Sequence, residues 1–344
     1  MELAFILEKF ILIIIVFVIT LVIAMYSTLA ERKVAGFMQD RFGPERAGPF
    51  GILQPLCDGG KFFFKEEIIP AGAHKPLFIL GPTLAIITAC IGSAVIPWGQ
   101  SLTIGDRVVD LQVADINVGI LYIFGVVALG VYGIMLGGWA SNNKFSLMGA
   151  IRAASQSISY ELAMGLSIIA LLMLTQSLSL KEIVAQQEGF NWNIWSQPLG
   201  FLIFLICAFA ECNRVPFDLP ECETELVGGY HTEYSSMKLG LYMFSEYINM
   251  FVSSALMASL YFGGYNFPFM YDLGLSQNWI TIIGVFVFFA KIIAFIFFFM
   301  WIRWTLPRFR YDQLMNLGWK ILIPLALGNI ALTGIFIILK DKFF

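Results

Sequence analysis

The stretch at residues 199–230, "LGFLIFLICAFAECNRVPFDLPECETELVGGY", joins an apolar run directly to a cluster of acids. About twelve apolar residues are too few to cross a hydrocarbon core of ~30 Å, which needs ~20 helical residues. The helix that begins here must therefore carry Glu211 and then Arg214 within the bilayer. Five acids fall within fifteen residues, and a single cation, Arg214, opposes them; the acids are Glu211, Asp218, Glu221, Glu223 and Glu225.

The whole chain has the composition of a membrane protein. It is 58% hydrophobic and 13% charged over 344 residues, whereas a soluble domain carries about 25% charged residues. Apolar runs of spanning length predict eight transmembrane helices in one all-α polytopic membrane domain over residues 1–344. The expected spans are 3–29, 77–97, 116–138, 145–174, 199–216, 239–262, 279–303 and 320–339.

The distribution of basic residues predicts the orientation. Fifteen of the 21 Lys and Arg residues fall in the connections that follow odd-numbered spans, and five lie on the opposite side. The positive-inside rule then places the odd-to-even loops in the cytoplasm and both termini outside it. The first run remains as a span, because it begins with Glu2 and has no small-residue cleavage site before residues 31–33.

Most of the charge lies in three cytoplasmic segments, 31–76, 213–237 and 304–319, where function is expected. The stretch 51–70, "GILQPLCDGGKFFFKEEIIP", mixes Leu and Phe with Asp58, Lys61 and other charges. It predicts an amphipathic helix at the membrane surface, with an ordinary loop helix covering the bundle as the alternative. Gly133 and Gly137, four residues apart in one span, predict a close helix contact.

Several ionisable residues lie at membrane depth. Glu161, Glu246 and Lys291 fall inside expected spans, and each would cost about 2.5–3.5 kcal/mol if it faced lipid. One interpretation is structural ion pairing, Lys291 with one acid and Arg152 with another. Acids on three spans outnumber the buried bases, however, and like charges in one site raise one another's pKa. We therefore favour a proton path through these acids.

The acidic loop of the opening stretch also has a structural alternative. Pro216 and Pro220 prevent a continuous helix there, and Asp218 with Glu221 resembles a capping box at the start of a new helix. Capping uses two acids and not five, and Glu221 repels Glu225 on one helical face. We interpret the loop as an acidic, hydrated path toward Glu211.

Motifs for other chemistries are missing from the sequence. The five Cys show no C-x-x-C pair, the two His lie far apart, and there is no H-E-x-x-H, P-loop or G-x-G-x-x-G motif. A metal site built by this chain alone is not expected, nor is a nucleic-acid partner.

Four long segments resemble the H-subunit family (mitochondrial subunit 1) of proton-pumping NADH:quinone oxidoreductase, respiratory complex I. They occur in the family's order, from the first span to the last, with small departures such as Glu45, Cys212 and Cys222. The segments are "ERKVAGFMQDRFGP" (31–44), "GPFGILQPLCDGGKFFFKE" (48–66), "AECNRVPFDLPECETELVGGYHTEYSSMK" (210–238) and "WIRWTLPRFRYDQLMNLGWK" (301–320).

The resemblance implies a role and a set of site residues. It implies a translocase subunit, not catalytic alone, that forms the membrane part of the quinone chamber and the first acidic stretch of the proton-coupling path. The chamber residues would be Glu31, Arg32, Asp58, Lys61, Arg214, Asp218, Arg303 and Arg308. The path residues would be Glu161, Glu211, Glu221, Glu223, Glu225 and Glu246.

The resemblance also implies the surroundings of the chain. Quinone is the substrate, this chain binds no cofactor, and flavin and iron–sulfur clusters belong to partner subunits of the membrane and peripheral arms. The expected location is the bacterial inner membrane, among lipid, with the mitochondrial inner membrane as the alternative. Other functions left open are a homologous subunit of a ferredoxin-linked or hydrogenase-type complex, and a stand-alone proton-coupled transporter.

Overall fold

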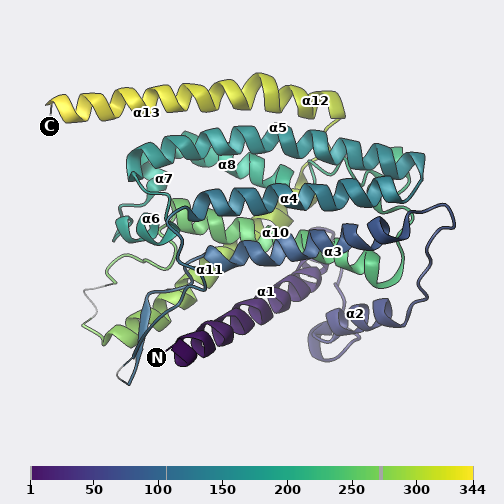
Figure 1. Ribbon diagram of the computed structural model, residues 1–344, viewed down its shortest axis with the longest axis horizontal. Helices are drawn as coiled ribbons and strands as arrows, with labels where there is room; N and C mark the ends of the chain where they lie inside the picture. The colour runs from purple at the N-terminus through teal and green to yellow at the C-terminus, as the bar shows by residue number, and fades with distance from the viewer. Residues whose placement is uncertain (1, 106, 271–273, 344) are drawn as a thin grey trace.

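The computed structural model describes residues 2–105, 107–270 and 274–343. Long helices run side by side along its longest axis (Figure 1). They are α1 (Glu2–Met38), α3 (Lys75–Ile91), α4 (Gly119–Ala140), α5 (Lys144–Thr175), α8 (Pro198–Glu211), α10 (Ser236–Tyr261), α11 (Gln277–Thr305), and α12 (Tyr311–Asn316) continuing into α13 (Ile323–Phe343). The all-α fold of a multi-pass membrane protein is confirmed.

The expected number of spans stays a prediction. Six helices in the described part of the chain are long and apolar enough to cross a membrane: α1, α3, α4, α5, α11 and the α12–α13 unit. The other two expected spans correspond to α8 and α10. The 14 residues of α8 extend ~21 Å at ~1.5 Å per residue, which is short of a bilayer core. The 26 residues of α10 are long enough, but polar side chains, including Glu246, interrupt them.

Both ends of the chain lie at the same end of the bundle (Figure 1). The opposite end holds α2 (Gln54–Phe64) and the loop between α8 and α10, which contains α9 (Glu223–Leu226) and the 3-10 turn η3 (Gly229–His231). The expected helix within 51–70 is therefore present. Its Phe62 packs against Gly240 of α10, whereas Phe63 and Phe64 are exposed. One apolar side of α2 is therefore covered by the bundle, and another is exposed.

Several smaller elements were not expected from the sequence. An antiparallel hairpin of β1 (Ser101–Ile104) and β2 (Arg107–Asp110) follows α3 and the 3-10 turn η2 (Gly92–Val95). Two short helices, α6 (Leu180–Gln186) and α7 (Asn193–Ser196), precede α8, and a 3-10 turn, η1 (Pro49–Gly51), precedes α2. A π-helical turn, η4 (Leu317–Leu322), joins α12 to α13. These segments are too short for an apolar period to reveal them.

The close contact expected at the α4 glycines is confirmed. A Cβ on Gly133 would lie 2.9 Å from Ala85 N and from Gly81 O of α3, and a Cβ on Gly137 would lie 2.0 Å from Tyr242 Oη. The hydroxyl of Tyr242, on α10, donates to Gly133 O at 3.0 Å. Glycines thus let α3, α4 and α10 approach closely around the functional residues.

Candidate functional site

The site is built where α8 ends inside the bundle. Gln156, a fully buried side chain of α5, donates from Nε2 to Ala210 O at 2.8 Å, to Asn213 Oδ1 at 3.2 Å and to Phe217 O at 2.9 Å. One acceptor, Ala210 O, belongs to the last turn of α8, and the other two belong to the chain that follows it. These bonds fix the chain that leaves α8, and hence the positions of Glu211 before it and Arg214 after it.

Arg214 is the centre of a buried charge cluster. Its Nη1 donates to Glu31 Oε2 of α1 at 3.0 Å, and its guanidinium lies 4.1 Å from the centroid of the Tyr247 ring. Glu31 also accepts from Tyr247 Oη at 2.8 Å and pairs with Arg303 of α11. Arg214 Nε is 4.0 Å from Glu246 Oε2 of α10, so one cation separates two buried carboxyl groups.

Glu246 is linked to the acidic loop through Tyr230. The Tyr230 hydroxyl lies 2.9 Å from Glu221 Oε1 and 3.3 Å from Glu246 Oε1. Because a hydroxyl donates a single proton, Tyr230 can bond to both carboxyl groups at once only if one of them is protonated. Burial raises the pKa of Glu221, but the hydrogen bonds from Glu246 and Tyr230, with His231 and Arg214 nearby, lower the pKa below its ordinary value.

Asp218 lies on the side of the same loop nearer α11. Its Oδ2 accepts from Arg308 Nη2 at 2.7 Å, and Arg308 Nη1 lies 3.1 Å from Cys222 Sγ. Burial, followed by the negative charge of Glu221, raises the pKa of Asp218 to about 6, although Arg308 and Arg303 act in the opposite direction. This carboxyl group can therefore change charge close to neutral pH.

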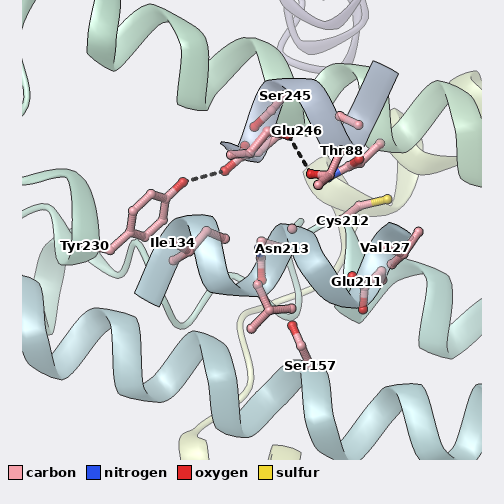
Figure 2. A pocket seen from close by; sticks show the side chains of 15 residues that line it. Thr88, Val127, Ile134, Ser157, Glu211, Cys212, Asn213, Tyr230, Ser245 and Glu246 are labelled. Carbon is pink, nitrogen blue, oxygen red and sulfur yellow. Dashed lines mark hydrogen bonds between the residues drawn. The ribbon is translucent and has the colours of Figure 1, made fainter. Parts of the chain in front are cut away.

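A small internal cavity connects Glu246 to Glu211. Both residues line it, with polar groups of Thr88, Ser157 and Asn213 among its walls, and Figure 2 shows Tyr230 bonded to Glu246 at its edge. Its volume is about 30 Å³, whereas a water molecule needs ~10–15 Å³ on this measure. The space between the two acids therefore has room for water and polar groups to bind it.

Glu161 is placed close to this cavity without lining it. It interacts electrostatically with Glu211, and each of the two has one buried carboxyl oxygen, Glu161 Oε1 and Glu211 Oε2, with no hydrogen-bond partner among the described residues. The sequence thus placed three acids at membrane depth, and the fold brings them into one series.

Other expected site residues lie farther from this series. Arg32 pairs with Asp58 of α2 at 2.7 Å on the surface, and Lys61 is exposed on the same helix. Glu225 pairs with Arg152 of α5, so the acid that Arg152 engages belongs to the loop and is not one of the acids expected at membrane depth. The side chain of Glu223 falls outside the described residues.

Two structural interpretations of the sequence were wrong. Lys291 does not pair with an acid among the described residues; its Nζ donates to the carbonyls of Phe262, Gly264 and Asn266 at 2.7, 2.8 and 2.6 Å. Asp218 and Glu221 do not cap a helix, because α9 begins at Glu223 after Cys222 and has no side-chain cap. Instead, Asp218 accepts from Arg308 and Glu221 accepts from Tyr230. Glu225 pairs with Arg152.

Sequence reasoning missed the neutral members of the site. Tyr230, Tyr247 and Gln156 carry no charge, so a search for buried charges passes over them. Their signal was nevertheless present, since Gln156 lies inside an apolar span and the two tyrosines flank or follow the acids. Buried polar side chains need partners, and that rule would have drawn attention to all three.

Comparisons with known proteins agree along the whole chain. The sequence matches the NADH dehydrogenase family over residues 10–334. It is 69% identical over 335 residues to an H subunit of NADH-quinone oxidoreductase from Cytophaga hutchinsonii, covering 97% of this chain and 98% of that protein. It is 63% identical over 341 residues to the H subunit of NADH-quinone oxidoreductase from Flavobacterium psychrophilum, covering 98% and 99%. The chain belongs to the NADH dehydrogenase family.

Membership of the NADH dehydrogenase family confirms the resemblance seen in the four sequence segments. These relatives are named as subunits of NADH-quinone oxidoreductase, an enzyme complex, and other subunits are therefore the expected partners. The ferredoxin-linked, hydrogenase-type and stand-alone transporter alternatives are not favoured.

Proposed function

We propose that the chain forms the membrane part of the quinone chamber of a proton-translocating NADH-quinone oxidoreductase and the first stretch of its proton path. The observation that carries this proposal is the position of Arg214. It lies between Glu31, which belongs to the expected chamber set, and Glu246, which lines the cavity leading to Glu211. Chamber and path residues therefore share one buried cation.

The chemistry follows from what quinone reduction requires. A quinone takes up two electrons and two protons to become a quinol, so its reduction changes the charge balance of the groups around it. The charge of Arg214 acts on Glu246 across 4.0 Å, where two unit charges interact by about 4 kcal/mol at an effective dielectric constant of 20. A change of charge in the chamber therefore alters the electrostatic energy of Glu246 before any proton has moved between the chamber and Glu246.

The proton path then runs inward through carboxyl groups and water. The Tyr230 hydroxyl lies between Glu221 and Glu246, both Glu246 and Glu211 line the cavity, and Glu161 interacts with Glu211 beyond it. In this proposal the chamber residues are Glu31, Arg32, Asp58, Lys61, Arg214, Asp218, Arg303 and Arg308. Glu225 and Glu223 belong to the acidic loop at the mouth of the path.

The proposal includes the surroundings of the chain. Quinone is the substrate, and electrons reach it from flavin and iron–sulfur clusters held by partner subunits. The chain lies in the bacterial inner membrane in contact with lipid, with its loop-rich end in the cytoplasm and both termini on the other side. The basic residues gathered at the loop-rich end support this orientation.

Neutral substitutions in the path test the proposal. Glu161→Gln and Glu246→Gln keep the shape of each side chain but remove its exchangeable charge. We expect both variants to lose coupled quinone reduction and proton pumping in inverted membrane vesicles, while NADH oxidation by an artificial acceptor continues. Glu188→Gln, an exposed acid near the end that holds the termini, is the control. Unaltered pumping in both path variants would refute the path.

A further inference from the structure

His231 occupies a position beside the acidic loop that the proposed function leaves unused. It ends the turn η3, in which Gly229 adopts φ +63°, and a Cβ there would lie 1.7 Å from Pro220 O. Only glycine permits this close approach of backbone to backbone. The turn is therefore pressed against the start of the acidic loop, with Tyr230 buried and the His231 side chain 16% exposed.

The contacts of His231 lead to Glu221 and, through Tyr230, to Glu246. His231 Nε2 is 3.6 Å from Glu221 Oε1, and the same oxygen accepts from Tyr230 Oη at 2.9 Å. The imidazole and the Tyr230 ring meet edge to face, with centroids 5.2 Å apart. Glu221 thus has an imidazole on its outer side and Tyr230 with Glu246 on its inner side.

Other charged side chains around η3, among the residues that the structure describes, are engaged by partners of their own. Arg152 on α5, which packs against this turn, is engaged by Glu225, and Glu233 accepts from Asn143 at the start of α5. Asp218, beyond Glu221, is held by Arg308. Within the described residues, Glu221 is the charged partner of His231.

We infer that His231 exchanges protons between cytoplasmic water and the Glu221–Glu246 carboxyl pair, at a point separate from the quinone chamber. This inference rests on the proposed function. Histidine is the side chain that exchanges protons most readily near neutral pH, and here the side chain is 16% exposed while its Nε2 lies 3.6 Å from the Glu221 carboxyl group.

Each proton transfer balances. The imidazolium Nε2–H gives its proton to the Glu221 carboxylate, and neutral His231 is then reprotonated from water. The Tyr230 hydroxyl passes the proton inward by giving its own to Glu246 while it takes one from Glu221. The distance of 3.6 Å exceeds a hydrogen bond, so the first transfer needs a small approach of the ring or one bridging water.

The inference is tested with the intact complex in membrane vesicles. His231→Gln keeps a polar side chain that cannot titrate, and His231→Ala leaves space for added imidazole. We expect quinone reduction to fall by up to about a hundredfold in kcat, with KM for quinone and artificial-acceptor NADH oxidation unchanged. The limb of the pH profile that reports this group should disappear, and imidazole in the buffer should restore turnover and pumping in His231→Ala.

The other histidine of the chain is the matched control. His74, at the start of α3, belongs to neither the chamber nor the path, and His74→Ala should behave as wild type, with or without imidazole. If both His231 variants match His74→Ala in kcat, pH profile and pumping, the inference is overturned. A loss of activity that imidazole does not restore, with a pH profile of unchanged shape, would also overturn it.

Failure of the inference is distinguishable from failure of the proposed function. If the His231 variants pump normally and Glu246→Gln does not, the proposed path is retained and only the proton exchange at His231 is overturned. Normal pumping in Glu161→Gln and Glu246→Gln would remove the path itself.

Discussion

At the scale of single residues, the site depends on charges that are buried but paired. Arg214 and Glu31 are each less than a tenth exposed, and removing one member of a buried pair typically costs about 3–5 kcal/mol. The cost arises because the remaining charge loses its partner in a medium of low dielectric constant. Such pairs hold α1, α10 and the end of α8 together in one arrangement, and in the proposed function this arrangement keeps the chamber residues next to the path residues.

Asp218 gives a prediction about pH and stability. Its pKa is about 6 in the fold, above the ordinary 3.8. Between these values the folded state binds more protons, so this group's contribution to the free energy of unfolding falls as the pH rises from about 4 to 6 and stays low above that. In Asp218→Asn this pH-dependent loss of unfolding free energy is absent, because the amide does not titrate. The thermal midpoint of the variant complex, relative to wild type, should therefore rise between pH 5 and pH 7.5; an equal difference at both values contradicts the raised pKa.

At the scale of elements, the approach of α3 to α4 determines whether the cavity forms. Thr88 and Ala85 of α3 and Val127 and Gly130 of α4 line the cavity together with Glu211 and Glu246. The helices come this close because Gly133 presents no side chain to the α3 backbone. Larger residues there would separate the two helices and displace the cavity walls.

Two glycines of α4 provide a matched pair of substitutions. Gly133→Val places a side chain against Ala85 N and Gly81 O, whereas a Cβ on Gly125 would have no atom within 4 Å. Both changes introduce the same β-branched residue into the same helix. We expect Gly133→Val to destabilise the complex by about 1–3 kcal/mol or more, seen as a lower thermal midpoint and less assembled complex. Equal effects of Gly133→Val and Gly125→Val would contradict the close contact.

Lys291 of α11 stabilises the turn that follows α10 through hydrogen bonds. Its ammonium group has three donors, and all three bond to carbonyl groups, those of Phe262, Gly264 and Asn266. The Nζ atom also lies over the ring of Trp192, 5.0 Å from the ring centroid. The turn has Gly263 and Gly264 at positive φ, so its carbonyls converge on one point. The lysine supplies donors that the backbone of this turn lacks.

Removal of this ammonium group has a local signature. Lys291→Met leaves three carbonyls without a donor, at about 1–3 kcal/mol for each that stays buried. We expect faster amide hydrogen exchange around residues 262–266, with little change at the loop between α8 and α10. Lys9→Met, which removes one bond to Gln112 O, should give a smaller effect confined to its own surroundings. Unchanged exchange around 262–266 would show that the turn holds without Lys291.

At the scale of the whole molecule, the two ends of the bundle differ in chemistry. One end holds α2 and the acidic loop, and the other end holds the termini, the hairpin and α6 (Figure 1). This separation matches the segregation of basic residues in the sequence.

The proposed orientation in the membrane can be tested by labelling. Cys57 is the exposed cysteine among the five, so Cys57→Ser provides a background of low reactivity. In that background, Lys342→Cys should react with a membrane-impermeant thiol reagent in intact cells. Arg46→Cys, on the loop before α2, should react only after the membrane is permeabilised. Reaction of Arg46→Cys alone in intact cells would reverse the orientation.

The sequence by itself determined the membrane class, the approximate positions of the long helices and the family. Apolar runs of about spanning length are a local property, and so are the acids that interrupt them. The glycine contact of α4 and the helix within 51–70 were also readable, because spacing on one helix suffices for both.

Only the tertiary structure decided which groups meet. Arg214 joins Glu31, 183 positions away in sequence, and Lys291 meets backbone carbonyls where an acid was the expected partner. Helices that are apolar on nearly all sides give no period from which their rotation and depth can be derived. Pairing across the bundle is instead determined by close packing, by glycine contacts and by the need of each buried polar group for a partner.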